Sequence, residues 1–329
     1  MDTPTIRPSP NSPMFALCDL WRFIHVIMRW SIGLVVVLGG AGVLQACAQK
    51  EPTAFERPGL HNIVRFYDGF YSGSAPEGDA GYDSLRELGV RTVLSVDGAP
   101  PNATRIEAHE MRSVHLPVGY DGFDDARKAQ LVRAVRDLDK PIYLHCHHGK
   151  HRSAAAAATI AISLGWLSRE QAIQCMRIAG TSPAFERLWE CVRAAYPLAP
   201  EVIDAGSCEL PAITPPDSLV ASMVAIDEAF DELLEHEQQG WHQSPSERES
   251  NAVMDAAQLA DLFRVLSVQA QDHSCGVLAV TEARAWLAQA ARDAGRLEWC
   301  LGEGRLDEAT SMMSALRADC LQCHRSHRE

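Results

Sequence analysis

The sequence is short of positive charge. It contains 30 Lys and Arg residues against 43 Asp and Glu residues, and the formal net charge is -13 at pH 7. Proteins that bind nucleic acid need clustered Lys and Arg to neutralise phosphates, so this balance argues against a nucleic-acid partner. Any site for an anion must therefore be a local concentration of positive charge. The chain also lacks an internal repeat, so a repeat architecture is not expected.

Strand signals are absent from residues 216–329. This segment instead has four helical stretches, at residues 218–238, 251–271, 279–298 and 306–324. In the first of them, apolar residues recur at three- and four-residue spacing, as in Met223, Ile226 and Phe230, which is typical of one buried helix face. We therefore expect an all-α, antiparallel four-helix bundle. Four prolines in and beside residues 201–215 predict a linker before it.

Residues 58–200 are expected to form an α/β domain. Short apolar runs that favour strands alternate with stretches that favour helices, which is typical of a central, mostly parallel sheet with flanking helices. The expected strands are residues 64–71, 90–96, 113–118 and 141–145, and the expected helices are residues 81–88, 124–138, 153–164, 168–178 and 184–196.

The first residues of the chain read as an export leader, residues 1–47. Two arginines precede an uncharged, mostly apolar run, the layout of a secretory signal. The run ends in LQAC, which resembles the lipobox of bacterial lipoproteins and implies that Cys47 is lipidated and becomes the N-terminus. An uncleaved membrane anchor is the alternative, and a start at Met28 would leave a compact signal. Both interpretations place the following residues outside the cytoplasm, anchored to a membrane on the periplasmic side of a Gram-negative bacterium.

The most specific motif is HCHHGKHRS, from His145 to Ser153. It follows an apolar strand and precedes an alanine-rich helix. A strand, a tight loop and a helix N-terminus together bind phosphate, because loop N–H groups and the positive end of the helix dipole converge on the anion. Gly149 permits a sharp turn, and Arg152 can hold two phosphate oxygens through its planar guanidinium. The same positive field favours the reactive thiolate form of Cys146.

This motif resembles that of the dual-specificity branch of the protein tyrosine phosphatases, and the order of strands and helices around it fits that family. The resemblance implies that Cys146 attacks phosphorus and forms a cysteinyl-phosphate while Arg152 holds the transferring group. Ser153 would assist the departure of the sulfur, and His145 would tune the loop from behind. The loop residues expected to bind the substrate are His147, His148, Gly149, Lys150 and His151. No cofactor is needed for this reaction.

Such an enzyme needs a general acid to protonate the leaving oxygen, usually an aspartate on an upstream loop. The candidates are Asp121, Asp124 and Asp125. Asp124 and Asp125 lie where a helix is expected to begin, and N-capping accounts for them. Asp121 lies in a glycine-flanked loop and is the expected acid.

Two alternatives concern the ligand of this loop. Its four histidines could bind a metal, although Lys150 and Arg152 would repel a cation there. The substrate is either a phosphorylated protein, with phosphotyrosine, phosphoserine or phosphothreonine, or an inositol phosphate. Lys150 adds a fixed positive charge, and basic loops of this type resemble those of relatives that act on inositol phosphates.

A second motif, CLQCH, occupies Cys320 to His324 near the end of the chain. It is the pattern of c-type haem attachment, in which Cys320 and Cys323 bind the haem vinyl groups and His324 binds iron. A structural disulfide, a zinc half-site and a redox dithiol are the alternatives for the cysteine pair. Haem c is attached outside the cytoplasm, so the motif and the export leader support each other.

A four-helix segment with this motif near its C-terminus resembles the cytochrome c′ family. The resemblance implies a covalent haem c among the helices, with Met223 as the candidate sixth iron ligand and a redox protein as a partner. Core packing is the alternative role of Met223. The leading hypothesis is thus a membrane-anchored phosphatase fused to a haem domain. The rival is a haem-based electron-transfer or sensor protein whose phosphatase-like domain only binds a phosphorylated ligand.

Overall fold

The structure is a computed structural model of the 329-residue chain. It describes residues 54–215, 219–241, 251–269 and 281–327. The expected leader and Cys47 lie outside the described residues. Among the described helices, none combines the length and the apolar character that crossing a bilayer requires.

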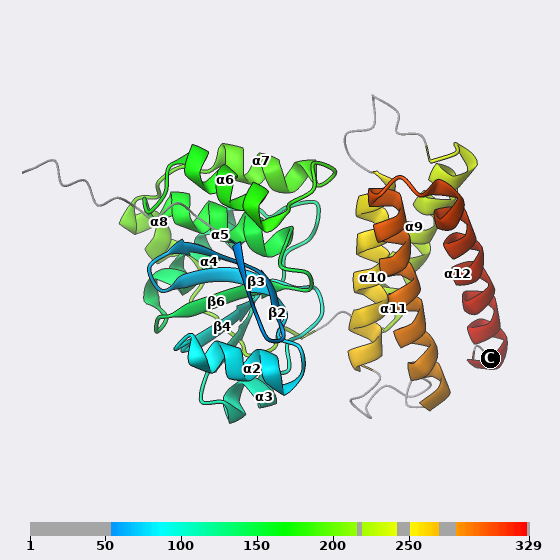
Figure 1. The fold of residues 1–329 in the computed structure, drawn as a ribbon, viewed down its shortest axis with the longest axis horizontal. Coiled ribbons are helices and arrows are strands. Elements are labelled where there is room, and N and C mark those ends of the chain that lie inside the picture. Colours follow the sequence, from blue (N-terminus) through cyan, green and yellow to red (C-terminus); the bar gives the residue numbers. More distant parts are fainter. Residues whose placement is uncertain (1–53, 216–218, 242–250, 270–280, 328–329) are drawn as a thin grey trace, which may run out of the picture. The chain divides into compact units, whose positions relative to one another are not determined.

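The first part of the described chain is built on one six-stranded sheet, drawn with its helices in Figure 1. Its strands are β1 (Ala54–Arg57), β2 (Leu60–Tyr67), β3 (Phe70–Ser74), β4 (Thr92–Ser95), β5 (Arg112–His115) and β6 (Ile142–Cys146), in the spatial order β1-β2-β3-β6-β4-β5. The pairs β3–β6, β6–β4 and β4–β5 are parallel, whereas β1–β2 and β2–β3 are antiparallel. The α/β class is confirmed, but the sheet is mixed rather than mostly parallel.

The mixed sheet results from a hairpin within the single strand expected at residues 64–71. The chain turns at Asp68 and Gly69, and Gly69 has a φ of +68°, in the left-handed region that favours glycine. Two strands, β2 and β3, therefore replace one, and they run antiparallel. The Asp68-Gly69 pair is itself a hairpin signal, and it interrupts the expected strand after Tyr67.

Helices cover both faces of this sheet. They are α2 (Gly78–Glu87), α3 (Ala103–Ala108), α4 (Asp125–Asp137), α5 (Arg152–Ser163), α6 (Arg169–Ala179), α7 (Glu186–Ala194) and α8 (Pro200–Ala205). One apolar cluster joins α2 and α3 to side chains such as Val93 and Tyr143. A larger cluster joins α4, α5, α6 and α7 to the alternate side chains, such as Leu94 and Leu144. This alternation along β4 and β6 places the core on both sides of the sheet.

The segment 201–215, expected as a linker, contains helix α8 and packs along the sheet. The His115 N–H donates to the Pro211 carbonyl at 2.8 Å, and the Thr214 hydroxyl donates to the His115 carbonyl at 2.6 Å. The edge strand β5 is therefore covered by chain rather than left open. Pro200 lies at the first turn of α8, where a missing N–H costs nothing.

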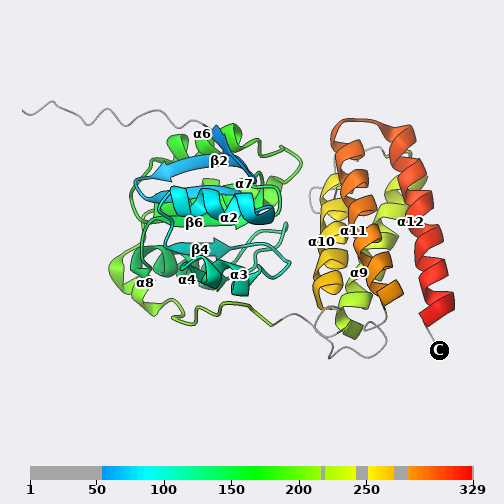
Figure 2. The same cartoon turned by 60° about the horizontal axis from the view of Figure 1, so that its bottom comes forward.

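The second part of the described chain is helical, as expected. Its helices are α9 (Leu219–Gln238), α10 (Ala252–Gln269), α11 (Thr281–Gly302) and α12 (Leu306–His327), and Figure 2 shows them side by side. They share an apolar cluster that includes Leu233, Leu259 and Leu297. Trp241 Nε1 donates to Thr310 Oγ1 at 2.9 Å and ties the end of α9 to the start of α12. An antiparallel bundle of the cytochrome c′ type stays a prediction.

Candidate active site

The central strand β6 ends at Cys146. The strand lies between β3 and β4, and its last ladder partner is Ser74 of β3. Every residue of β6 is buried, and helix α5 begins six positions after the cysteine, at Arg152. The loop between them thus lies at the carboxyl edge of the parallel strands and at a helix N-terminus, where anions bind in α/β folds.

Two carbonyl groups of this loop point away from its centre. The His147 carbonyl accepts from the Ala75 N–H at 3.1 Å, and the His148 carbonyl accepts from Asn62 Nδ2 at 2.9 Å. In a trans peptide, the carbonyl and the following N–H point in opposite directions. The N–H groups of His148 and Gly149 therefore face the loop centre, where a phosphate oxygen would bind.

Gly149 is required by the loop for two reasons. Its φ is +75°, and a Cβ there would lie 2.3 Å from the Gly73 carbonyl carbon and 2.3 Å from the Ser74 nitrogen. Both atoms belong to the backbone of β3, so they cannot move aside without distorting the sheet. The close approach of loop and strand therefore fixes the shape of the anion site.

Replacing Gly149 by alanine should distort this loop and lower both the stability and the phosphatase activity that the sequence leads us to expect. The left-handed conformation alone costs about 1–2 kcal/mol, and the backbone clash adds to it. Gly165→Ala is the matched control, because Gly165 has a φ of +70° and nothing within 4 Å of its Cβ position. The midpoint temperature of thermal unfolding and kcat should fall further in Gly149→Ala than in Gly165→Ala. Equal decreases in the two variants would show that the backbone clash at Gly149 is relieved at no cost.

The predicted nucleophile, Cys146, and its predicted helper, Ser153, lie in contact in the structure. Cys146 Sγ lies 3.3 Å from Ser153 Oγ, and the Ser153 hydroxyl also reaches the Gly73 carbonyl at 3.4 Å. His145 lies behind the loop, is 3% exposed and has no hydrogen-bond partner on either ring nitrogen within the described chain. Burial lowers the pKa of His145 to about 4, so its ring is neutral at pH 7.

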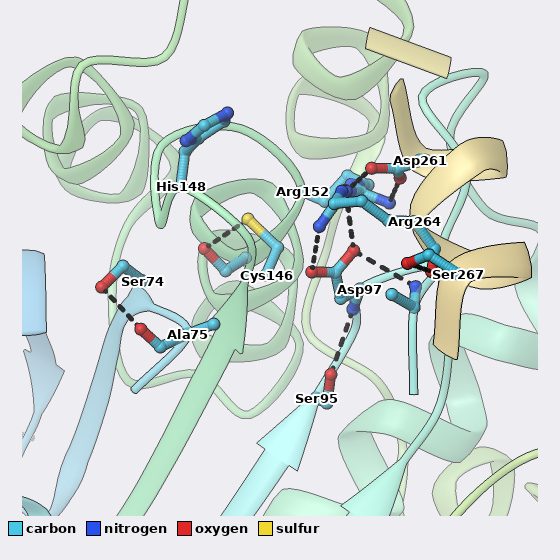
Figure 3. A network of polar contacts seen from close by, with 12 residues as sticks. Ser74, Ala75, Ser95, Asp97, Cys146, His148, Arg152, Asp261, Arg264 and Ser267 are labelled. Carbon is cyan, nitrogen blue, oxygen red and sulfur yellow. Dashed lines mark hydrogen bonds and ion pairs between the residues drawn. The ribbon is translucent and has the colours of Figure 1, made fainter. Parts of the chain in front are cut away.

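Arg152 is almost completely buried, at 1% exposed. Its Nη2 donates to Asp97 Oδ1 at 3.1 Å, and its guanidinium carbon lies 4.2 Å from the centre of the Tyr120 ring. Its Nη1 pairs with Asp261 of α10. The Nε has no hydrogen-bond partner within the described chain, so one donor of the planar fork stays free for a ligand. Figure 3 shows this network beside Cys146.

Asp97 is a site residue that the sequence analysis missed. It follows β4 and is 4% exposed. Burial alone would raise its pKa, but the guanidinium groups of Arg264 and Arg152 hold the pKa well below its usual range. The carboxylate is therefore ionised, and it cannot serve as the general acid, which must carry a proton. The sequence signal that could have pointed to Asp97 is its position as a charged residue just after an apolar strand.

The other loop side chains divide into exposed and buried. His147, His148 and Lys150 are exposed, as expected for groups that meet a substrate. The ring of His151 instead packs against Phe185 at 4.1 Å between centroids, and burial lowers its pKa to about 3. The side chain of His151 was expected to bind the substrate, but it is buried against Phe185 instead. Within the described chain, no group of three or more His, Cys, Asp or Glu could hold a metal ion.

The candidate acids occupy different places. Asp124 caps α4, where its side chain accepts from the Arg127 N–H at 2.7 Å, and Asp125 pairs with Lys128 at 2.5 Å. Asp121 is exposed and has neither role. Its neighbour Tyr120 contacts the Arg152 guanidinium through its ring, so the loop that carries Asp121 touches the start of α5.

Part of the chain is similar in sequence to known phosphatases. No known protein-family model matches the chain. The chain is 27% identical over 148 residues to dual specificity protein phosphatase 12 of Mus musculus, covering 43% of this chain and 43% of that protein. It is 24% identical over 162 residues to dual specificity protein phosphatase TpbA of Pseudomonas aeruginosa, covering 48% of this chain and 73% of that protein. This chain contains a dual-specificity phosphatase-like domain.

The phosphatase-like domain covers about half of the chain, and the match spans less than half the length of the mouse relative. Both relatives are named dual specificity protein phosphatases. Among solved structures, the crystal structure of TpbA covers 46% of this chain and 93% of that chain, at 23% identity and a TM-score of 0.40. The catalytic core of the PP-IP phosphatase SIW14 of S. cerevisiae covers 43% of this chain and 88% of that chain, at 16% identity and a TM-score of 0.38.

Replacing Asp121 by asparagine should slow the phosphatase-like domain most with substrates whose leaving group needs a proton. We expect kcat for a phosphoserine peptide to fall about 100-fold, the lower end of general-acid effects. The loss should be smaller with p-nitrophenyl phosphate, because its leaving group departs without protonation. Asp124→Asn is the control, since asparagine also caps helices. Unchanged kcat in Asp121→Asn with both substrates would remove Asp121 from the mechanism.

The second motif lies on the last helix, α12. Cys320, Cys323 and His324 stand at positions i, i+3 and i+4, which share one face of a helix. Both thiols are free and half-buried, and Met223 of α9 packs against the same apolar cluster as Cys320. His324 is exposed. Two unpaired thiols beside a histidine on one helical face fit the donor set of haem c.

Proposed function

We propose that this protein is an exported phosphatase that hydrolyses phosphate monoesters through a cysteinyl-phosphate intermediate. The observation that carries the proposal is Cys146 at the end of the central strand, with Ser153 at 3.3 Å and the buried Arg152 at the start of α5. A nucleophile, an anion-binding loop and a bidentate guanidinium are the parts that phosphoryl transfer through a covalent intermediate needs.

The reaction has two steps. In the first, the Cys146 thiolate forms a bond to phosphorus, the bond to the leaving oxygen breaks, and Asp121 gives that oxygen its proton. In the second, water attacks the cysteinyl-phosphate, Asp121 takes up a proton from that water, and the thiolate leaves with a hydrogen bond from Ser153. Arg152 and the loop N–H groups hold the transferring phosphoryl oxygens throughout.

Two substrate classes suit this loop: phosphorylated proteins and inositol phosphates. The exposed side chains of His147, His148 and Lys150 support both, because they would contact whatever carries the phosphate. We would compare kcat/KM for a phosphotyrosine peptide, a phosphoserine peptide and inositol hexakisphosphate, using reduced protein from residue 48 onward. The highest value assigns the class. No phosphate release from these or from p-nitrophenyl phosphate would overturn the enzyme proposal.

We also propose that the helical segment carries haem c, held by Cys320 and Cys323, with His324 as an iron ligand and Met223 as the candidate sixth ligand. The bound group would supply a redox-active iron, and a redox protein would then be a partner. The unpaired thiols on one face of α12 support this. A pyridine haemochrome spectrum that survives acid-acetone extraction, and is lost in Cys320→Ala/Cys323→Ala, is expected. A colourless wild-type protein from cells that attach haem c would overturn it.

We further propose that the protein is a membrane-anchored lipoprotein on the periplasmic side of a Gram-negative bacterium. The apolar run that ends at Cys47 supports this proposal. The full chain, expressed in such a bacterium with labelled fatty acid, should take up label, and Cys47→Ser should not. Equal labelling of both proteins would reject Cys47 as the lipidation site.

A further inference from the structure

The phosphate-gripping guanidinium is already paired with carboxylates inside the chain. Arg152 Nη2 meets Asp97, which adjoins the sheet of the phosphatase-like domain, and Nη1 meets Asp261, which lies on α10 of the helical segment. A phosphate dianion needs two donors of this same planar fork. Asp261 therefore uses a donor that a substrate would compete for.

The carboxylate of Asp261 is buried and lies close to the backbone that follows β4. Asp261 is 8% exposed, and its Oδ2 would lie 3.2 Å from a Cβ placed on Gly98, which follows Asp97. Arg264, one turn further along α10, pairs with Asp261 and reaches Asp97 Oδ2 at 3.1 Å. Two carboxylates and two guanidinium groups thus balance each other in charge, as Figure 3 shows.

Further contacts seat α10 against the phosphatase-like domain. Met254 and Ala257 of α10 belong to the apolar cluster of that domain, and Asn251 Nδ2 donates to the Ala184 carbonyl at 2.7 Å. On α11, Glu298 Oε2 lies 3.9 Å from His148 Nε2 of the loop. Asp261 and Glu298 of the helical segment therefore both face the loop, and the charge complementarity of a bound anion lies in the pairing of Asp261 with Arg152.

We propose that α10 is an internal inhibitor of the phosphatase-like domain, in which the Asp261 carboxylate occupies the Arg152 guanidinium in place of a substrate phosphate. This proposal rests on the proposed phosphatase function. Substrate binds when α10 withdraws, so any ligand or partner that holds the helical segment away raises activity. The inhibition is reversible and competitive, because phosphate and Asp261 contact the same donor.

The first test replaces Asp261 by asparagine, which keeps the shape and removes the charge. We expect kcat/KM for p-nitrophenyl phosphate to rise about 10-fold through a lower KM, within the range of coupling between competing ligands. Glu303→Gln, an exposed carboxylate after α11, is the control and should leave kcat/KM unchanged. A kcat/KM in Asp261→Asn equal to or below that of the wild type would overturn the proposal.

A second test needs no catalysis and so separates this proposal from the proposed function. In a Cys146→Ser background, calorimetry should show inorganic phosphate binding about 10-fold more tightly when Asp261 is also asparagine. In the Cys146→Ser protein with Asp261 intact, saturating phosphate should speed hydrogen exchange in residues 252–269. This second readout keeps the proposal falsifiable if Asp261→Asn fails to fold. Unchanged exchange in α10 on phosphate binding would overturn the internal-inhibitor proposal.

Discussion

Replacing Cys146 by serine should abolish phosphate release from p-nitrophenyl phosphate and from phosphopeptides. Serine fits the same buried position at the end of β6, so the fold and the loop should persist. A serine hydroxyl is a much weaker nucleophile than a cysteine thiolate at neutral pH, and loss of a nucleophile costs at least roughly 1000-fold in kcat. Initial rates of phosphate release measure the effect.

The control for this variant is Cys208→Ser, because Cys208 is a free and exposed cysteine. It should keep the wild-type rate under reducing conditions. The pair of variants also tests the rival hypothesis of a domain that only binds. If Cys146→Ser and Cys208→Ser hydrolyse substrate equally, another group supplies the chemistry, and the cysteinyl-phosphate mechanism is wrong.

The second large effect is expected for Arg152→Lys. Lysine keeps the positive charge but lacks the planar fork, so it cannot hold two phosphoryl oxygens at once. An arginine that stabilises phosphoryl transfer contributes on the order of 1000-fold or more to kcat. The substitution also removes the Arg152 contact of the buried Asp97, which then keeps only Arg264 as a guanidinium partner. We therefore expect a loss of stability of about 3–5 kcal/mol as an upper bound, since the lysine charge remains nearby.

Steady-state kinetics and thermal unfolding together separate these two effects of Arg152→Lys. Arg193→Lys is the matched control, because Arg193 pairs with Glu186 on the surface of α7. Exposed pairs contribute about 0–1 kcal/mol, so this control should keep both activity and stability. A kcat of Arg152→Lys within a few-fold of the wild type would show that charge alone, without the planar fork, holds the phosphoryl group.

The strand, loop and helix around Cys146 could be predicted because their signal is local. Cys146, Gly149 and Arg152 lie within seven consecutive positions, and the flanking strand and helix have clear patterns. Asp97 could not be found in the same way, since its pairing with Arg152 joins residues that are 55 positions apart. Its place beyond β4, next to β6 in the sheet, follows only from the strand order.

The errors of secondary structure also have physical reasons. The Asp68-Gly69 turn is flanked on both sides by aromatic residues that favour strands, so β2 and β3 were expected as one strand. The prolines of residues 201–215 predicted a linker, although proline is compatible with the first turn of a helix such as α8. The contact of Asp261 with Arg152 could not be predicted from the sequence. Asp261 and Arg264 are three residues apart on a helix, and such a spacing is typical of a solvent-exposed ion pair.

Because β6 lies in the centre of the sheet, the parts of the site differ in the free energy needed to open them. Residues in the middle of a sheet exchange their amide hydrogens only when the whole fold opens, whereas loops and docked segments open on their own at lower free energy. Cys146 belongs to the first class, and both Asp121 and the α10 contact belong to the second. Cys146 therefore keeps its position as long as the protein stays folded. Asp121 and Asp261 can leave their positions by local opening, without global unfolding. In the proposed enzyme, the nucleophile is therefore fixed together with the fold, whereas the acid and the internal carboxylate depend on local opening.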